Sequence, residues 1–301
     1  MYLVTGHKGF LGRAILDQCP HTKEEFYGFD VPTHTIIDPD PWHTVANARA
    51  REYGFESSVA QLHSRIKECR LVIHAAAMAD FHDADQNKDM AYRINVEGTR
   101  NVAQGCLAAG IPMVYISTCC VYGNQKTVWT DESAFPDPTD WYAKTKLNGE
   151  HEIAKLAGLK WRICRLATFY GPGMREALFN AVALRAAASN GVIEVDGEGK
   201  QTRCYLHVDD AARAIWTIAE HGSDGETYNI AGVQEVSVME TINMASAVTG
   251  GKPEVRFRGQ RTGQIIRGLV NSSKLRNLGW RQKWEYLHGM KQTWEAMKNH
   301  A

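Results

Sequence analysis

A tyrosine and a lysine four positions apart, Tyr142 and Lys146 in the stretch DWYAKTK, are the first residues of this chain whose types and spacing could perform chemistry. Residues at i and i+4 share one face of a helix. A free tyrosine has a pKa near ~10, too high for a base at neutral pH, but a nearby ammonium favours the phenolate and lowers that pKa. The pair is either an acid–base unit or an ordinary solvated helix face, and the rest of the chain decides between them.

A glycine-rich loop near the start of the chain has the spacing of a phosphate-binding turn. In VTGHKGFLG, residues 4–12, the glycines follow the pattern GxxGxxG between a predicted strand and a predicted helix. Glycine lets backbone N–H groups approach a phosphate, and the helix N-terminus faces that phosphate with the positive end of its dipole. The alternative is a tight turn that binds no ligand. We expect a dinucleotide to contact Gly6, Gly9, Phe10, Leu11 and Gly12.

An aspartate at the end of the second predicted strand bears on the choice of dinucleotide. Asp30 follows Gly12 by eighteen residues, and no Arg or Lys occurs in the next ten. A carboxylate at this place accepts hydrogen bonds from the ribose hydroxyls and repels a 2′-phosphate. The pattern therefore favours NAD over NADP, although an aspartate before Pro32 could also belong to an ordinary turn.

Short apolar runs alternate with helical patterns through the first half of the chain. This alternation predicts an α/β fold with a Rossmann-like, doubly wound parallel sheet that is covered on both faces. Residues 31–55 give mixed signals, so a third strand cannot be placed within them. The predicted strands are 1–6, 25–30, 71–77, 111–118 and 160–171, and the predicted helices are 10–19, 84–109 and 139–157.

The pattern changes after residue 172, where glycine-rich loops, short strands and further helices follow. No Pro/Ser-rich linker separates the two halves. We expect a dinucleotide-binding domain over 1–172 and a smaller C-terminal α/β lobe over 173–301, with some of its segments returning to the main sheet.

Composition excludes several classes of partner. The chain has 34 Lys and Arg against 34 Asp and Glu, so nothing in its charge indicates nucleic acid or an acidic membrane surface. We find no signal peptide and no apolar run long enough to span a membrane. The seven cysteines show no metal-ligand spacing apart from the adjacent Cys119 and Cys120, which predicts reduced thiols, a cytoplasmic protein and no metal site.

Taken together, nine motifs in order resemble the extended short-chain dehydrogenase/reductase family, in its NAD-dependent nucleotide-sugar epimerase/dehydratase branch. The resemblance covers nearly the whole chain, whereas each motif alone is weak. The motifs are TGHKGFLG, VIHAAA, RINVEGTRNV, VYISTCCVYG, YAKTK, RLATFYGPGM, QTRCYLHVDD, GQRTGQ and SSKLRNLGW.

The resemblance implies roles for particular residues. Tyr142 becomes the catalytic acid/base, and Lys146 its partner and a ligand of the nicotinamide ribose. Thr118 is the hydroxyl that holds the substrate oxygen, with Ser117 as the less favoured neighbour; Thr118 could also be a plain buried strand hydroxyl. Further cofactor contacts are expected at Val31, Ala75 and Ala76.

Three positions depart from the family pattern. Cys119 and Cys120 stand where 4,6-dehydratases carry Asp-Glu, and a thiol is a poor acid for expelling water, so we discount dehydration. Thr168 stands where Asn often contacts the substrate, and Gln264 replaces an acid.

The resemblance also implies how a nucleotide-sugar is held. Arg203 and Arg261 match the family's phosphate-binding arginines, although both could be ordinary surface residues. Guanidinium groups suit a diphosphate because their planar donors bind phosphate oxygens in pairs. The expected substrate contacts are Thr118, Thr168, Arg203 and Arg261.

The activity that the resemblance implies is 4-epimerisation of a nucleotide-sugar through a transient 4-keto intermediate, with NAD as cofactor. A 4-ketoreductase or another alcohol dehydrogenase of the same fold is the alternative, and a non-catalytic dinucleotide sensor is a more distant one. The family also pairs two helices of each subunit across a two-fold axis. Helices 84–109 and 139–157, which are apolar on more than one face, would therefore form a homodimer, unless other segments cover them in a monomer.

Overall fold

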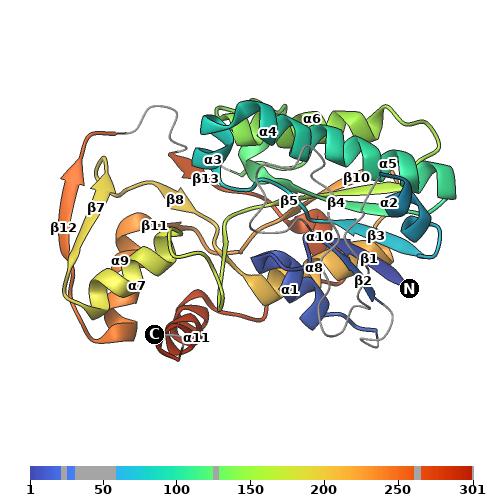
Figure 1. Cartoon of the computed structure of the whole chain (residues 1–301). Helices are drawn as coiled ribbons and strands as arrows, with labels where there is room; N and C mark the ends of the chain where they lie inside the picture. Colours follow the sequence, from blue (N-terminus) through green and yellow to red (C-terminus); the bar gives the residue numbers. More distant parts are fainter. Residues whose placement is uncertain (22–25, 31–58, 125–128, 261–265, 300–301) are drawn as a thin grey trace. The chain divides into compact units, whose positions relative to one another are not determined.

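The computed structural model describes residues 1–21, 26–30, 59–124, 129–260 and 266–299 (Figure 1). The expected cofactor contact Val31, the substrate contact Arg261 and the altered position Gln264 lie outside these residues. So does the segment 31–55, in which no strand could be placed from the sequence.

A six-stranded sheet forms the centre of the N-terminal part. Its strand order is β10-β5-β4-β3-β1-β2, and β1 pairs in parallel with both β2 and β3, as β3 does with β4. Strands β1, β3 and β4 are buried along their whole length, as expected for parallel strands covered on both faces. The strands are β1 Tyr2–Thr5, β2 Phe26–Phe29, β3 Leu71–His74, β4 Met113–Thr118, β5 Trp161–Leu166 and β10 Glu226–Ile230.

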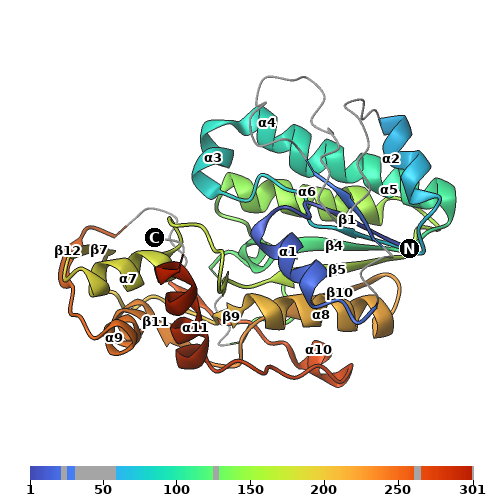
Figure 2. The same ribbon diagram turned by 60° about the horizontal axis from the view of Figure 1, so that its bottom comes forward.

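Helices cover both faces of this sheet (Figures 1 and 2). One face carries α1 and α8, which are tied together by a hydrogen bond of 2.8 Å from the Trp216 indole to the carbonyl of Ile15. The other face carries α2, α5 and α6. The doubly wound α/β fold predicted from the sequence is confirmed. These helices are α1 Phe10–Asp17, α2 Val59–Ile66, α5 Gly98–Ala109, α6 Trp141–Ala154 and α8 Val208–His221.

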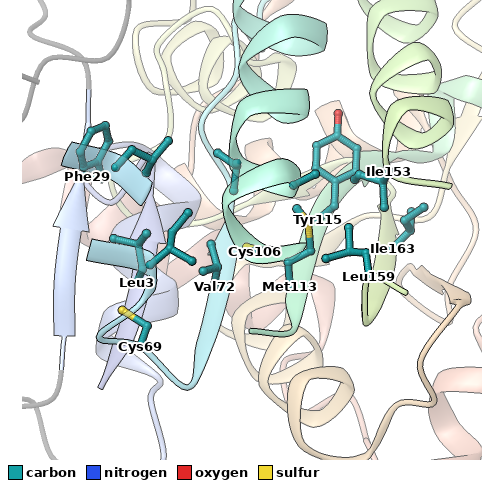
Figure 3. Packing of buried hydrophobic residues seen from close by; sticks show 14 residues of the cluster. Leu3, Phe29, Cys69, Val72, Cys106, Met113, Tyr115, Ile153, Leu159 and Ile163 are labelled. Carbon is teal, nitrogen blue, oxygen red and sulfur yellow. The ribbon is translucent and has the colours of Figure 1, made fainter. Parts of the chain in front are cut away.

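The main core lies between the sheet and helices α2, α5 and α6 (Figure 3). Leu3, Val72 and Met113 supply the sheet side, and Val102 and Ile153 the helix side; all five are buried. Each buried aliphatic side chain of this kind stabilises the fold by roughly 1.5–3 kcal/mol relative to an exposed one. This packing fixes helix α6 on strand β4.

The stretch predicted as one helix over 84–109 is several pieces, so that prediction is wrong in part. Asn87, with φ −123° and ψ 59°, separates helix α3, Phe81–Gln86, from helix α4, Lys88–Tyr92. A π-helical turn, Arg93–Glu97, then joins α4 to α5. A π-helical turn inserts one extra residue into the helix, and such turns are frequent at functional sites.

The strand predicted over 160–171 is also two elements. Strand β5 ends at Leu166, and a separate strand β6, Phe169–Tyr170, pairs in parallel with β9, Leu206–His207. The change occurs at Ala167, whose N–H donates to the carbonyl of Ile230 in β10.

The chain divides into two compact units, each assembled from separated segments. The first comprises Met1–Val121, Pro138–Arg165 and Ala212–Tyr228, and the second Tyr122–Asp137, Leu166–Ala211 and Asn229–Ala301. The chain therefore crosses between the units several times, and Ala212–Tyr228 belongs to the first unit.

In the second unit, helices α7, α9 and α11 pack around a core that includes Leu184, Ile242 and Met290. Buried Asp210 accepts hydrogen bonds from the N–H groups of Lys283 and Trp284, and so anchors the segment before α11. The remaining elements are α7 Phe179–Ala188, β7 Val192–Asp196, β8 Thr202–Arg203, β11 Val236–Ser237, α9 Val238–Thr249, β12 Glu254–Arg258, β13 Arg267–Gly268, α10 Ser273–Asn277 and α11 Tyr286–Lys298.

Among the described residues, no helix is long and apolar enough to cross a membrane. The same residues contain no cluster of three His, Cys, Asp or Glu side chains that could hold a metal ion.

Candidate active site

The glycine loop connects β1 to α1 and needs glycine at two positions. Gly6 has φ +71°, and a Cβ built on it would lie 2.7 Å from the backbone nitrogen of Ala76. A Cβ on Gly12 would lie 2.0 Å from the carbonyl oxygen of Gly6, so only glycine lets the helix approach the loop this closely. Helix α1 begins at Phe10 with no side-chain cap at Gly9, and the positive dipole end of a helix N-terminus suits an anion such as a phosphate. The loop therefore fits the dinucleotide expected from the sequence.

Asp30 lies at the carboxyl end of β2, beside this loop. One of its carboxylate oxygens accepts a hydrogen bond of 2.8 Å from the N–H of Lys8, which fixes the carboxylate against the loop. A carboxylate at this position can accept hydrogen bonds from the hydroxyls of an adenosine ribose.

A buried histidine joins the ends of strands β1 and β3. The ring of His74 contacts the Thr5 hydroxyl at 2.7 Å and the Thr99 hydroxyl at 3.0 Å. Burial lowers the pKa of His74 to about 3, so its ring is neutral at physiological pH. The Thr5 hydroxyl also accepts from the N–H of Ala76, and the Thr5 carbonyl from that of Ala75. The expected cofactor contacts Ala75 and Ala76 are thereby held next to Gly6.

Helix α6 places Tyr142 in its first turn and Lys146 one turn later. Asp140 caps the helix by accepting from the N–H of Ala143 at 2.7 Å. Asn95, from the π-helical turn, donates to the Thr145 hydroxyl, which in turn donates to the carbonyl of Tyr142. The position of Tyr142 is therefore fixed from the backbone side.

Lys146 is almost completely buried, with 2% of its surface exposed. Burial lowers the pKa of its ammonium to about 7, and the carboxylate of Glu150 opposes that change. The Nζ atom lies 4.2 Å from the centroid of the Tyr115 ring, where the face of the ring attracts a cation. The alternative interpretation, in which this pair lies on a solvated helix face, is therefore wrong for Lys146.

The two hydroxyls at the end of β4 have different partners. Ser117 donates to a carboxylate oxygen of Glu150 at 2.5 Å. Thr118 accepts a hydrogen bond of 3.2 Å from the N–H of Cys120. Neighbouring residues of a strand point to opposite faces. Since Ser117 is committed to Glu150, Thr118 remains the candidate for the substrate hydroxyl.

Sequence reasoning missed the buried partners of this site. Glu150 and Arg165 form a two-pronged ion pair, and Asn95 binds both the N–H and the carbonyl of Met78. The sequence did contain one signal for Glu150, its spacing. Glu150 follows Lys146 by four residues and Tyr142 by eight, so a helix places all three on one face.

Apart from Thr118 in the first unit, the expected substrate contacts lie in the second unit or outside the described residues. Thr168 is exposed, and its carbonyl accepts from the N–H of Leu206. Arg203 lies in β8 and donates to the carbonyl of Thr202 at 2.7 Å. Thr168 and Arg203 both lie in the second unit, and Arg261 lies outside the described residues.

A doubly wound sheet, a glycine loop at the end of its first strand and a buried lysine one turn beyond a tyrosine define a dinucleotide-binding α/β enzyme. Residues 2–231 match the model of the NAD dependent epimerase/dehydratase family, and the chain belongs to this family. The expected family and the expected cofactor, NAD, are confirmed.

Three similar proteins illustrate the family. A "Putative UDP-glucose 4-epimerase" of Methanocaldococcus jannaschii is 26% identical over 99% of both chains. MoeE5, solved in complex with UDP-glucuronic acid and NAD, has a TM-score of 0.86 at 24% identity, covering 100% of this chain and 99% of its own. DesIV, a dTDP-glucose 4,6-dehydratase from Streptomyces venezuelae, has a TM-score of 0.87 at 24% identity, covering 99% of this chain and 97% of its own. The same fold thus serves proteins named for different reactions.

Proposed function

We propose that this protein is an NAD-dependent nucleotide-sugar 4-epimerase in which Tyr142, Lys146 and Thr118 perform the proton chemistry. The observation that carries the proposal is the burial of Lys146 on the sheet-facing side of α6, one turn from Tyr142. Strand β4 ends at Thr118, and the glycine loop begins at the same edge of the parallel sheet, where α/β enzymes bind their ligands.

The residues of this chain have distinct roles in the proposed reaction. The Thr118 hydroxyl holds the C4 oxygen of the sugar, and the Tyr142 phenolate removes the proton from that oxygen. The Lys146 ammonium stabilises the phenolate and binds the nicotinamide ribose. NAD, when bound, supplies the reversible hydride acceptor that turns the C4 alcohol into a ketone and back. After the 4-keto sugar turns over in the site, Tyr142 returns the proton, so the reaction has no net redox change.

The remaining proposed contacts divide between cofactor and substrate. Residues 1–172 carry the NAD site, with the glycine loop facing the pyrophosphate and Asp30 facing the adenosine ribose. Residues 173–301 carry most of the substrate lobe. The cofactor contacts are Gly6, Gly9, Phe10, Leu11, Gly12, Asp30, Val31, Ala75, Ala76, Tyr142 and Lys146, and the substrate contacts are Thr118, Thr168, Arg203 and Arg261.

We also propose that the protein is a cytoplasmic homodimer. All seven cysteines are free thiols, which suits a reducing compartment. Met90 and Ile94 in the α4–α5 region and Leu147 in α6 remain partly exposed on helices that cover the sheet. Pairing of these helices with those of a second copy would remove that apolar surface from water.

The test combines cofactor analysis with a substrate panel. The purified protein is denatured and its released nucleotide identified, and the native protein is offered UDP-, GDP- and dTDP-sugars, including UDP-glucose and UDP-glucuronic acid. We expect bound NAD and interconversion of C4 epimers without an added reductant. Turnover that requires added NADH or NADPH in stoichiometric amounts would contradict the epimerase and indicate the 4-ketoreductase.

A further inference from the structure

The face of helix α6 that packs on the sheet is unusually polar. A helix in this position normally buries an apolar stripe. Here the buried positions include Thr145, Lys146 and Glu150. Burying charged side chains is costly unless they are paired, so this face must be stabilised by specific partners.

Glu150 has such partners on two different strands. Arg165 of β5 donates to both carboxylate oxygens, at 3.1 and 2.6 Å, and Ser117 of β4 donates to one of them at 2.5 Å. The Glu150 and Arg165 side chains are only 5% and 8% exposed. A two-pronged guanidinium and a hydroxyl hold the carboxylate in one orientation between the helix and the sheet.

Glu150 and its two partners lie one helical turn of α6 beyond Lys146, toward the C-terminus of the helix. Residues at i and i+4 of a helix have Cβ atoms about 5–6 Å apart. Gly149 lets the helix approach β4, because a Cβ there would lie 2.4 Å from the Tyr115 hydroxyl. The Tyr115 ring fills the space beside Lys146 and donates its hydroxyl to the Lys146 carbonyl at 3.4 Å.

The groups that face Lys146 come from four elements. His74 of β3 and Tyr115 of β4 are both uncharged, because burial lowers the pKa of His74 and raises that of Tyr115. Tyr142 and Glu150 lie on α6 itself, and Arg165 of β5 contacts Glu150. Among the described residues, Glu150 is the carboxylate that opposes the loss of a proton from Lys146.

We propose that Glu150, clamped by Arg165 and Ser117, is a positioning residue that keeps Lys146 in its ammonium form beside Tyr142. The inference rests on the proposed roles of Tyr142 and Lys146. Its physical basis is that a negative charge one turn away offsets the loss of water around the ammonium. Without that carboxylate, Lys146 would be largely a neutral amine at neutral pH and could no longer stabilise a phenolate.

The direct test is an NMR titration of Lys146 in protein labelled with ¹³C and ¹⁵N in lysine. The resonance of Lys146 is identified by its absence from the spectrum of Lys146→Met. In Glu150→Gln we expect the titration midpoint of Lys146 to fall by about one pH unit or more, a tenfold fall in the ratio of ammonium to amine at a given pH.

A matched control is available on the same helix. Glu152 pairs with Arg100 and Lys155, away from the sheet-facing side. Glu152→Gln removes an ion-paired glutamate two positions from Glu150, and it should leave the midpoint of Lys146 unchanged. An equal fall in both variants would overturn the proposal, since the effect would not be specific to Glu150.

A second variant covers the case in which Glu150→Gln fails to fold because Arg165 is left buried without its partner. In Glu150→Gln/Arg165→Met neither charge remains, and we expect a midpoint between those of the wild type and Glu150→Gln. A wild-type midpoint in either variant overturns the proposal.

The NMR result does not depend on any substrate. If no sugar is turned over by the wild type, the epimerase proposal fails while the titration still decides the role of Glu150. If a sugar is turned over, the alkaline limb of the kcat profile of Glu150→Gln should move to lower pH together with the midpoint.

Discussion

The environment of Lys146 differs from that usual for a lysine, which is mostly exposed. Its ammonium is removed from water, lies on the face of Tyr115 and depends on one carboxylate for charge compensation. Tyr142, one turn earlier, is partly exposed, which its proposed exchange of protons with a ligand requires. The contrast between a buried cation and an accessible phenol gives two predictions.

The first prediction concerns the phenol. Tyr142→Phe should retain the fold and NAD binding but lose roughly 10²–10⁴-fold in kcat, because general acid–base catalysis is worth about that factor. Tyr92→Phe, on helix α4, is the control and should keep its rate. Calorimetric titration with NAD and steady-state kinetics on the active sugar measure both properties. Wild-type turnover in Tyr142→Phe would show that another group moves the proton.

The second prediction concerns the stability of the protein without NAD. The pKa of Lys146 is lowered from its usual 10.5 to about 7 in the fold, so between these values the unfolded chain binds a proton that the folded chain has released. The free energy of unfolding of the wild type therefore rises with pH across this window, and the penalty for the buried charge is complete below pH ~7.

Lys146→Met removes that penalty. We expect the difference in Tm between Lys146→Met and the wild type to favour the variant most near pH 6. This difference should shrink as the pH approaches 10. Lys144→Met, at an exposed position of the same helix, should show no such trend. Thermal unfolding at several pH values measures both, and a Tm difference for Lys146→Met that does not change with pH would contradict the burial of a charged amine.

At the scale of elements, the turn from β1 to α1 depends on close backbone contacts that only glycine permits. Gly12→Ala would bring a Cβ to 2.0 Å from the Gly6 carbonyl oxygen, and neither backbone segment can move without displacing the glycine loop. We expect the variant to lose about 1–3 kcal/mol of stability from overpacking and most of its affinity for NAD.

Gly259→Ala is the matched control, because a Cβ there meets nothing within 4 Å. NAD titration and denaturant unfolding of both variants measure the two effects. If Gly12→Ala binds NAD as tightly as the wild type, the loop is not the phosphate site.

Local sequence patterns predicted the elements whose signals lie within a few residues. The β1–loop–α1 unit is one example, and the Tyr142–Lys146 helix is another. The sequence did not reveal the break at Asn87, because the buried residues Ala84 and Ala91, seven positions apart, keep helical spacing across it. The Glu150–Arg165 pair was missed for a different reason. Glu150 lies in α6 and Arg165 in β5, and the two side chains meet only after the helix packs on the sheet.

The molecule as a whole presents partly exposed apolar side chains on helices that also carry the candidate site. If these helices pair across a two-fold axis, sedimentation at micromolar concentration should give twice the mass of the 33.6 kDa chain. Leu147→Lys should convert this species to a monomer, because an ammonium would enter the apolar contact. Phe257→Lys replaces an apolar residue that is 58% exposed on β12, and should leave the mass unchanged. A wild-type monomer would refute the dimer and leave the assignment of Tyr142 and Lys146 untouched, as both lie in one subunit.

The return of β10 to the six-stranded sheet has a consequence for synthesis on the ribosome. The first unit cannot be complete until Tyr228 has left the exit tunnel, although its first segment ends at Val121. At ~5–20 residues per second this interval lasts roughly 5 to 20 s. Strand β5, once it has emerged, has no neighbour on one side until β10 follows, and the face later covered by α8 is open. The nascent chain should therefore bind chaperones until about residue 230 emerges, and a gene cut after codon 172 should yield an insoluble product.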